Sequence, residues 1–387
     1  MSVNRLDLPA AIIHGGGSRE RIGELAKELG GTRALLVTDP GVIALGFAGA
    51  VERGLVDAGL DVCVFSEVQP DPTDENVAAG VKALEEHRAD IVIALGGGSP
   101  IDTAKVIAVR PTNPGPLADF MGLHKVSNPG LPLIAVPTTA GTGSEATKVA
   151  VITDTVRNVK MMMLSAPLLP RAAVVDYDLS MSMPKPLTAA VGVDTLTHGI
   201  EAYVSKKANA MTDPIALSCI GLVGRHLKAA WSNPEDCAAR EGMMLAACQG
   251  GMAFSNSSVC LVHGMSRPIG AVFHVPHGLS NAVLLPTVTE YSWSESASRY
   301  AEVARALNCA DDKMSDEQAC ESLIDWLRKL NDDLELPRLS GCHGVSREIF
   351  ERQVEKMASD ALASGSPANN PRVPSVEEIV ELYHSAW

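Results

Sequence analysis

The first half of the chain alternates short, continuously apolar runs with segments of helical periodicity, and this alternation constrains the fold more than any other feature. The apolar runs predict strands at 34–38, 61–65, 90–95, 133–136 and 172–176. Helix-period segments such as 43–58 and 75–87 separate them. Strands that are apolar throughout are buried on both faces, which is typical of a parallel sheet covered by helices on both sides. The first half is therefore predicted to be an α/β domain.

The second half has a different pattern. After about Asp178 the chain has long segments rich in Ala, Leu and Met, with apolar residues at helical spacing and no strand alternation. The predicted helices span 185–205, 213–231, 236–254, 296–308, 317–330, 345–363 and 375–386. The length of 387 residues exceeds the roughly 250–300 at which a single core stops growing. Because two prolines interrupt the pattern at 181–186, we predict an α/β domain over residues 1–182 and an all-α domain over 183–387.

The charge balance restricts the partners of this protein. The chain has 32 Lys and Arg against 46 Asp and Glu, a net charge of −14, whereas general nucleic-acid and anionic-membrane binders need clustered positive charge. No apolar run approaches the roughly 18 residues of a spanning helix, and the N-terminus does not resemble a signal peptide. The eight cysteines are scattered without a Cys-x-x-Cys pair. We expect a cytoplasmic protein with reduced thiols, and neither nucleic acid nor membrane as a partner.

A glycine-rich loop follows the third predicted strand. The strand ends at Leu95 and continues into Gly96, Gly97, Gly98 and Ser99, with a helix expected to begin at 101–102. Glycines let the backbone approach a ligand closely, and the N–H groups of a helix start favour a pyrophosphate. Ser99 is expected to cap the helix. The alternative is a tight turn that binds nothing, because this is neither a Gly-x-Gly-x-x-Gly fingerprint nor a Walker loop.

Two further strand ends carry polar residues suited to a nucleotide. The loop at 137–145 contains Thr138, Thr139 and Thr142 between glycines. Asp39 ends another predicted strand, where a carboxylate can accept hydrogen bonds from a ribose diol and repel a 2′-phosphate. This position favours NAD over NADP. The alternative for Asp39 is a helix cap or turn before Pro40.

A possible metal site is distributed over the second half. Asp194 and His198 are four residues apart on a predicted helix, so both project from one face. Two later stretches contain His263 and His277. One carboxylate and three imidazoles suit Fe²⁺ or Zn²⁺, and the lack of a thiolate argues against a closed structural zinc site. A single histidine is more often a hydrogen-bonded core or surface residue, but the four residues together favour a metal.

Four segments of the sequence together resemble the iron-containing (group III) alcohol dehydrogenase family. They are 96–102, 137–145, 194–203 and 263–278. The resemblance implies a dinucleotide-binding α/β domain, a helical domain, a cleft between them for NAD(P) and a divalent metal, and a homodimer or larger homo-oligomer. It implies that Asp194, His198, His263 and His277 are the metal ligands. The cofactor residues that it implies are Asp39, Gly96, Gly97, Gly98, Ser99, Asp102, Thr138, Thr139, Thr142 and Lys160.

The sequence departs from the family pattern at two places. Arg267 stands where many relatives have a further histidine, and Lys148-Val149 stands where relatives often have a polar amide. His274 is a substitute candidate for proton handling, with a packing role as the alternative. Arg267 would suit a carboxylate, sulfonate or phosphate on the substrate; pairing with a protein carboxylate or the cofactor is the alternative.

The expected reaction is hydride transfer between NAD(H) and a small alcohol/aldehyde pair, with an anionic substituent as one option. The metal, Fe²⁺ with Zn²⁺ as a substitute, would polarise the substrate oxygen as a Lewis acid. The main alternative is a dehydroquinate-synthase-like lyase, which uses NAD only transiently together with a metal. A non-catalytic nucleotide-binding protein is the third class. A metal-free relative of the maleylacetate-reductase type is disfavoured, because all four ligand positions are filled.

Overall fold

The computed structural model describes residues 4–157 and 159–387, which form two compact units. One unit is Asp7–Ser182, and the other contains Met183–Trp387 together with residues 4–6.

The first unit is built on a six-stranded sheet in the order β1-β9-β6-β4-β2-β3, with every neighbouring pair parallel. Its strands are β1 (Ala11–His14), β2 (Arg33–Val37), β3 (Asp61–Phe65), β4 (Ile91–Gly96), β6 (Leu133–Pro137) and β9 (Ala172–Val175). The predicted α/β class is confirmed. The five predicted strands agree with β2, β3, β4, β6 and β9 to within one residue at each end, whereas β1 was not predicted.

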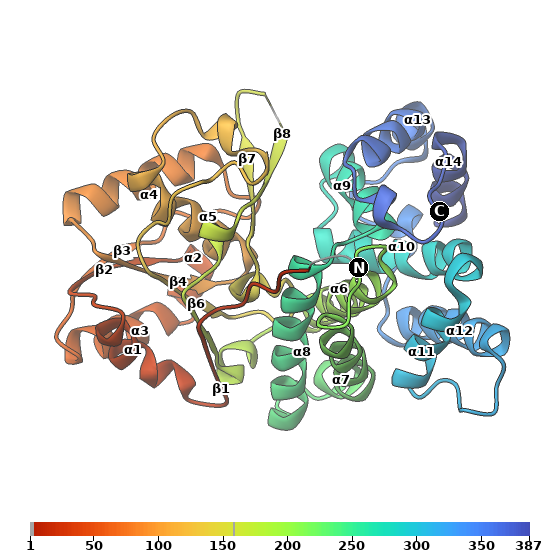
Figure 1. Ribbon diagram of the computed structural model, residues 1–387, viewed down its shortest axis with the longest axis horizontal. Helices are drawn as coiled ribbons and strands as arrows, with labels where there is room; N and C mark the ends of the chain where they lie inside the picture. The colour runs from red at the N-terminus through yellow and green to blue at the C-terminus, as the bar shows by residue number, and fades with distance from the viewer. Residues whose placement is uncertain (1–3, 158) are drawn as a thin grey trace. The chain divides into compact units, whose positions relative to one another are not determined.

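Helices cover both faces of this sheet, as continuous apolar strands require. Leu35 and Val37 on β2 join a core with α4 (Asp74–His87) and α5 (Gly98–Val109). Ala34 and Leu36 on the same strand face a second core with α1 (Ile22–Glu28) and α3 (Phe47–Asp57). Figure 1 shows these two helix pairs on opposite sides of the strands.

The structure corrects two local predictions in this unit. The segment 43–58 is not one helix: α2 (Pro40–Ala44) ends before Gly46, whose φ of 77° separates it from α3. Ser99 does not cap α5, because the helix begins at Gly98 and Gly97 is its N-cap residue. Gly97 has an extended backbone there and makes no side-chain cap, so the helix starts earlier than Pro100 indicated.

A second, three-stranded sheet in the first unit was also not predicted. It contains β5 (Gly122–Leu123), β7 (Val149–Asp154) and β8 (Val159–Leu164) in the order β5-β8-β7. β7 and β8 are antiparallel, and β5 is parallel to β8. Ala150 and Ile152 on β7 are buried and pack into the same core as α5.

The described residues of the second unit form helices joined by loops, with no strand among them. Its α-helices are α6 (Lys185–Val204), α7 (Asp213–Ser232), α8 (Cys237–Asn256), α9 (Leu261–Phe273), α10 (His277–Ser292), α11 (Ala297–Ala306), α12 (Asp316–Asp333), α13 (Arg347–Ala363) and α14 (Val376–Ser385). α6 is buried around almost its whole circumference, so the polar side chains that it carries lie inside the unit. Among the described residues, no helix combines the length and hydropathy needed to cross a membrane.

Candidate cofactor and metal sites

The carboxyl ends of β2 and β4 mark the point where the strand order of the parallel sheet reverses. β3 lies on one side of β2, whereas β4, which follows β3 in the chain, lies on the other side. Open α/β sheets bind ligands beyond the carboxyl ends of their strands at such a reversal. Asp39 follows β2, and Gly96 ends β4, so two predicted cofactor residues lie at this position.

Asp39 lies against the glycine loop. Gly96 has a φ of 150°, and a Cβ atom there would lie 2.6 Å from Pro100 Cγ and 3.2 Å from Asp39 Oδ2. Asp39 Oδ1 accepts a hydrogen bond of 2.9 Å from Val42 N and so caps α2. One oxygen of the carboxylate therefore caps the N-terminus of α2, and the other faces the glycine loop. The cap and the cofactor role do not exclude each other.

The threonine loop packs beside the glycine loop. Thr138 N donates a hydrogen bond of 3.0 Å to Gly96 O. A Cβ atom on Gly97 would lie 3.4 Å from Thr139 Oγ1, and one on Gly98 would lie 3.0 Å from Thr142 Cγ2. The first turn of α5, which contains Ser99, begins between these two loops. Free backbone N–H groups beside hydroxyl groups form a suitable environment for a pyrophosphate.

A buried lysine links α5 to the end of the threonine loop. Lys105 Nζ donates hydrogen bonds to Ser144 Oγ at 2.7 Å, Thr147 Oγ1 at 2.9 Å and Val149 O at 2.6 Å. Burial lowers the pKa of Lys105, and the nearby carboxylates of Asp102 and Glu145 oppose this shift. Sequence reasoning did not single out Lys105, although a lysine inside an apolar helix, three residues after Asp102, is a signal that could have found it.

Asp102 and Lys160, both predicted to contact the cofactor, make contacts within the protein. Asp102 accepts hydrogen bonds from Ser144 Oγ at 2.6 Å and from Val151 N at 2.9 Å, so it also fastens the segment after the threonine loop. Lys160 on β8 places Nζ 2.5 Å from Asp71 Oδ1, with 38% of its side chain exposed.

The predicted metal ligands of the second unit converge. Asp194 Oδ1 on α6 lies 3.8 Å from Nε2 of His198, 3.7 Å from Nε2 of His263 and 4.0 Å from Nε2 of His277. The ligand atoms of Asp194, His263 and His277 all lie within 4.8 Å of one another. His198 lies beside this group, with its ring stacked on His263 at a centroid distance of 4.8 Å.

Close helix packing brings the ligands together. His263 lies in the first turn of α9, and His277 is the first residue of α10. A Cβ atom on Gly278 would lie 3.0 Å from Ala190 O and 3.4 Å from Asp194 Cβ. The absence of a side chain at Gly278 therefore allows the start of α10 to lie directly on α6, beside Asp194.

Neutral imidazoles present lone pairs to this centre. Burial lowers the pKa of His263 well below its ordinary value, and the charges of His198 and Arg267 lower it further while Asp194 opposes the shift. Desolvation lowers the pKa of His277 in the same direction. The second nitrogens are also engaged: His263 Nδ1 is 2.6 Å from Glu201 Oε2, and His277 Nδ1 is 3.3 Å from Ser266 Oγ.

The contacts of Asn281 on α10 show whether the ligand atoms of Asp194, His263 and His277 suit a cation. Its Nδ2 lies 2.6 Å from Asp194 Oδ1, 3.1 Å from His263 Nε2 and 3.2 Å from His277 Nε2. A single NH₂ group, with two hydrogens to donate, thus faces a carboxylate oxygen and two imidazole nitrogens. These are the donors that Fe²⁺ and Zn²⁺ take in proteins, so the residues fit the predicted metal. Sequence reasoning missed Asn281 and Glu201, although Glu201 lies seven residues after Asp194 on the same helix face.

The two predicted catalytic residues are placed differently. Arg267 lies one turn after His263 on α9, and its charge acts on both His263 and His277. Burial lowers the pKa of Arg267, and Glu201 opposes that shift. His274 is exposed and ends α9 as its C-cap residue, with a φ of 56°. Arg267 is thus close enough for its charge to lower the pKa of two predicted ligands. His274 instead forms the C-terminal end of α9.

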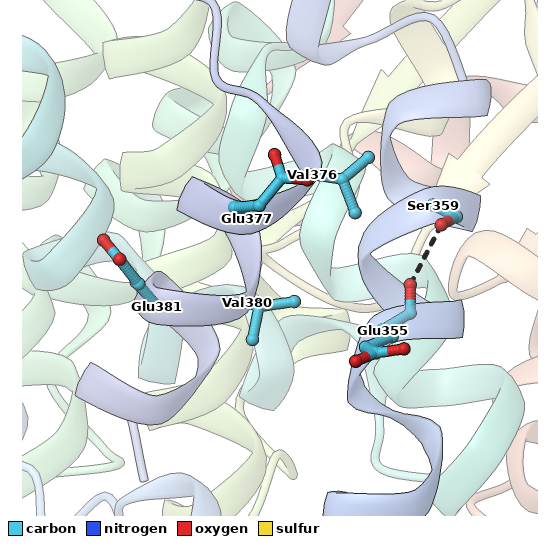
Figure 2. A pocket seen from close by; sticks show the side chains of 6 residues that line it. All are labelled: Glu355, Ser359, Val376, Glu377, Val380 and Glu381. Carbon is cyan, nitrogen blue, oxygen red and sulfur yellow. Dashed lines mark hydrogen bonds between the residues drawn. The ribbon is translucent and has the colours of Figure 1, made fainter.

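A surface hollow of about 490 Å³ lies between α13 and α14 (Figure 2). It contains none of the predicted site residues. Three glutamates, Glu355, Glu377 and Glu381, line it together with small and apolar residues. These carboxylates make the hollow unsuited to a phosphate-bearing or acidic ligand.

Comparisons with known proteins agree over both units. The iron-containing alcohol dehydrogenase model matches residues 9–177, and the model for the C-terminal part of the Fe-containing alcohol dehydrogenase family matches residues 188–387. The chain belongs to the iron-containing alcohol dehydrogenase family. Its fold and its class as a dehydrogenase follow from this membership.

Several family members are similar over almost the whole chain. The 1,3-propanediol dehydrogenase of Citrobacter freundii is 39% identical, over 95% of this chain and 94% of its own. The NAD-dependent methanol dehydrogenase of Bacillus methanolicus is 36% identical, over 98% of both chains. A solved 1,3-propanediol oxidoreductase structure covers both chains completely, with a TM-score of 0.95 and 35% identity.

Proposed function

We propose that this protein is a metal-dependent alcohol dehydrogenase that transfers hydride between NAD(H) and a small alcohol/aldehyde pair. The convergence of Asp194 Oδ1 with the Nε2 atoms of three histidines carries the proposal. The family relatives add support, because one is named an NAD-dependent methanol dehydrogenase and another a 1,3-propanediol dehydrogenase. The dehydroquinate-synthase-like lyase is not favoured by these relatives.

The proposal assigns different tasks to the two domains. Residues 1–182 would bind the cofactor, and residues 183–387 would hold the metal and the substrate. Asp194, His198, His263 and His277 would be the ligands, and Fe²⁺ is the expected ion with Zn²⁺ as a substitute. When bound, such an ion supplies a Lewis acid that polarises an alcohol or carbonyl oxygen, and the nicotinamide supplies or accepts the hydride.

The residues of the first domain would bind and orient the cofactor. The glycine loop and the N-terminus of α5 would bind the pyrophosphate through backbone N–H groups. The Oδ2 atom of Asp39 would accept a hydrogen bond from the ribose diol, which favours NAD over NADP. The second nitrogens of His263 and His277, held by Glu201 and Ser266, would keep both rings facing the ligand centre.

We further propose an acidic substituent on the substrate. The guanidinium of Arg267 acts on the pKa of two ligand histidines, so it is close enough to influence charge at the reacting centre. A carboxylate, sulfonate or phosphate would be stabilised there, and a cationic substrate would be disfavoured. Values of kcat/KM for neutral and acidic aldehydes, measured in wild type and in Arg267→Ala, test this. An equal loss on both classes would remove the acidic substituent from the proposal.

The experiment that tests the main function uses full-length protein stripped of metal with a chelator and reloaded separately with Fe²⁺ and Zn²⁺. Small alcohols and aldehydes are assayed with NAD(H) and NADP(H). We expect net formation of NADH from an alcohol, lost in the stripped protein and restored by metal. A lyase would give no net NADH, and a non-catalytic protein would show no turnover in any arm.

Cellular location and assembly are further parts of the proposal. We expect the enzyme to be cytoplasmic and to form a homodimer or larger homo-oligomer, on the basis of the family resemblance. Light scattering of the purified protein would give its mass in solution. A mass equal to the 40.7 kDa of one chain would contradict the expected assembly.

A further inference from the structure

Glu201 is a buried carboxylate that is not one of the four proposed metal ligands. It lies on α6, one turn after His198, and only 2% of its surface is exposed. An ionised carboxylate in such a position is costly unless its oxygens receive hydrogen bonds. Burial raises the pKa of Glu201 to about 7, and hydrogen bonds from the backbone of Cys260 and Val262 oppose this shift.

Three donors meet this carboxylate. Glu201 Oε2 accepts hydrogen bonds from Cys260 N at 2.8 Å and His263 Nδ1 at 2.6 Å. Oε1 accepts one from Val262 N at 2.6 Å. Because Cys260 and Val262 stand at the start of α9, the carboxylate fastens the first turn of that helix, where His263 lies, onto α6.

The other nitrogen of His263 shows which tautomer this arrangement selects. Asn281 Nδ2 lies 2.6 Å from Asp194 Oδ1, an atom that can only accept from it, so Nδ2 is the donor. The same Nδ2 is 3.1 Å from His263 Nε2, and because an amide nitrogen cannot accept a hydrogen bond, this contact fits a ring whose Nε2 presents its lone pair. The proton of the neutral ring is then on Nδ1, where Glu201 accepts it.

We infer that Glu201 is a positioning residue for the metal centre: it holds His263 as the Nδ1–H tautomer, with the Nε2 lone pair directed at the ligand group, before any metal binds. The inference rests on the proposed metal site and adds to it a residue that is not a ligand. A carboxylate behind a ligand histidine orients the ring and raises its basicity, and loss of such partners typically costs about 10–100-fold in metal affinity.

Glu201→Gln is the informative change, because an amide cannot accept at both ends. Whichever way the amide is turned, its NH₂ group faces a backbone N–H of Cys260 or Val262. If the NH₂ group is turned toward His263, it donates to Nδ1 and moves the ring proton to Nε2, which then has no lone pair for a metal. We expect the affinity for Zn²⁺ to fall about 10–100-fold.

Asp236→Asn is the matched control. Asp236 caps α8 in the same unit by accepting a hydrogen bond of 2.9 Å from Ala239 N, and it contacts no proposed ligand. Both variants lose a structural carboxylate, so both are compared with wild type for thermal stability. Zn²⁺ affinity is measured on chelator-stripped, full-length protein by competition with a chromophoric chelator. NADH affinity, measured by fluorescence, should be equal in all three proteins.

Nitrogen-15 NMR of protein labelled in its histidine rings supplies a readout that does not depend on the Gln variant folding. His263→Gln identifies the signal of His263 by its disappearance. In stripped wild type we expect this ring to be protonated on Nδ1, and in Glu201→Gln to have lost that state. A ring protonated on Nε2 in wild type would overturn the inference.

The affinity measurements separate two kinds of failure. If wild type binds no Zn²⁺, the proposed function is wrong at its metal site. If wild type binds Zn²⁺ and Glu201→Gln binds it equally well, or Asp236→Asn loses as much affinity as Glu201→Gln, the positioning role is wrong and the proposed function stands.

Discussion

The carboxylate of Asp39 meets two demands at once. Its Oδ1 atom caps α2 through Val42 N, while its Oδ2 atom lies against Gly96. A substitution that removes only the charge should separate the helix cap from the proposed contact with the cofactor. Asparagine is as good a helix cap as aspartate, whereas alanine provides none.

Asp39→Asn should therefore relax the preference for NAD over NADP and leave stability nearly unchanged. Removing a negative charge that faces a 2′-phosphate is expected to improve the NADP/NAD ratio of kcat/KM by about tenfold or more. Asp39→Ala should change the ratio similarly and also lose about 1 kcal/mol of stability with the cap. Kinetics with both cofactors and thermal melts check this. An unchanged cofactor ratio in both variants would remove Asp39 from the cofactor site.

Gly96→Ala should damage the cofactor site directly. The new Cβ would lie 2.6 Å from Pro100 Cγ, which forces the loop to move, and the φ of 150° disfavours any side chain. We expect NADH affinity, measured by fluorescence, to fall at least about tenfold. Gly115→Ala is the control, since Gly115 also has a positive φ, of 114°, but nothing lies within 4 Å of its Cβ position. If both variants lost stability but kept full NADH affinity, the glycine loop would not be the cradle.

At the scale of elements, α5 acts on the cofactor loops through its interior. Lys105 and Asp102, one turn apart, together hold Ser144, Thr147 and the start of β7. The loop that carries Thr138, Thr139 and Thr142 is thus fixed at its far end by a helix whose N-terminus borders the same site. We therefore expect the affinity for the cofactor to fall when these contacts of α5 with the threonine loop are removed.

Lys105→Met should weaken NADH binding by about tenfold, because the methionine keeps the volume but removes three hydrogen bonds from the loop. Lys82→Met on α4 is the control: Lys82 is exposed, and its 3.8 Å contact with Glu86 contributes little to stability. Fluorescence titration with NADH compares the variants. Equal affinity in Lys105→Met and wild type would show that the loop does not need this anchor.

Five strands of the parallel sheet, β2, β3, β4, β6 and β9, were predictable because their continuous apolar runs are local signals, and the long helices of the second unit were predictable from their helical periodicity. The β7–β8 hairpin was not, because its strands alternate half-buried and buried residues and only their pairing with each other and with α5 makes them a sheet. The break at Gly46 and the early start of α5 depend on backbone angles that composition does not specify. Boundaries set by glycine backbones are therefore the least predictable from the sequence.

The candidate site followed the same rule. Asp194 and His198 could be paired from their spacing on one helix, and His263 and His277 were added because one carboxylate and three imidazoles suit a metal; the resemblance to a family then implied the same four ligands. Glu201 and Asn281 were missed because their importance lies in which atoms they face, and this depends on how α6, α9 and α10 pack. The sequence therefore indicated the metal-ligating side chains, whereas the side chains that contact and orient these ligands depend on tertiary packing.

At the scale of the whole molecule, removing the metal should affect one part of the chain selectively. The proposed ligands lie on α6, α9 and α10, so metal binding should slow amide hydrogen exchange in these helices. At a metal concentration of 100 Kd, the free energy of opening should rise by up to about 2.7 kcal/mol. NADH should instead protect the glycine and threonine loops. Hydrogen-exchange mass spectrometry of stripped, Zn²⁺-loaded and NADH-bound protein compares these regions. Zn²⁺ protection confined to residues 96–102 would contradict the assignment of tasks.

The pairing of β1 with β9 has a consequence for biosynthesis. β2, β3, β4 and β6 can associate in turn as the ribosome releases them, but β1, the first strand made, has its neighbour in the last strand of the sheet. The nascent chain must therefore keep Ala11–His14 unpaired until Ala172–Val175 has emerged. During that interval the edge of β6 that later pairs with β9 is also open, so a chaperone or another nascent chain could bind either to this edge or to the unpaired first strand. The N-terminal strand, although made first, is therefore the last strand of the sheet to find its hydrogen-bonding partner.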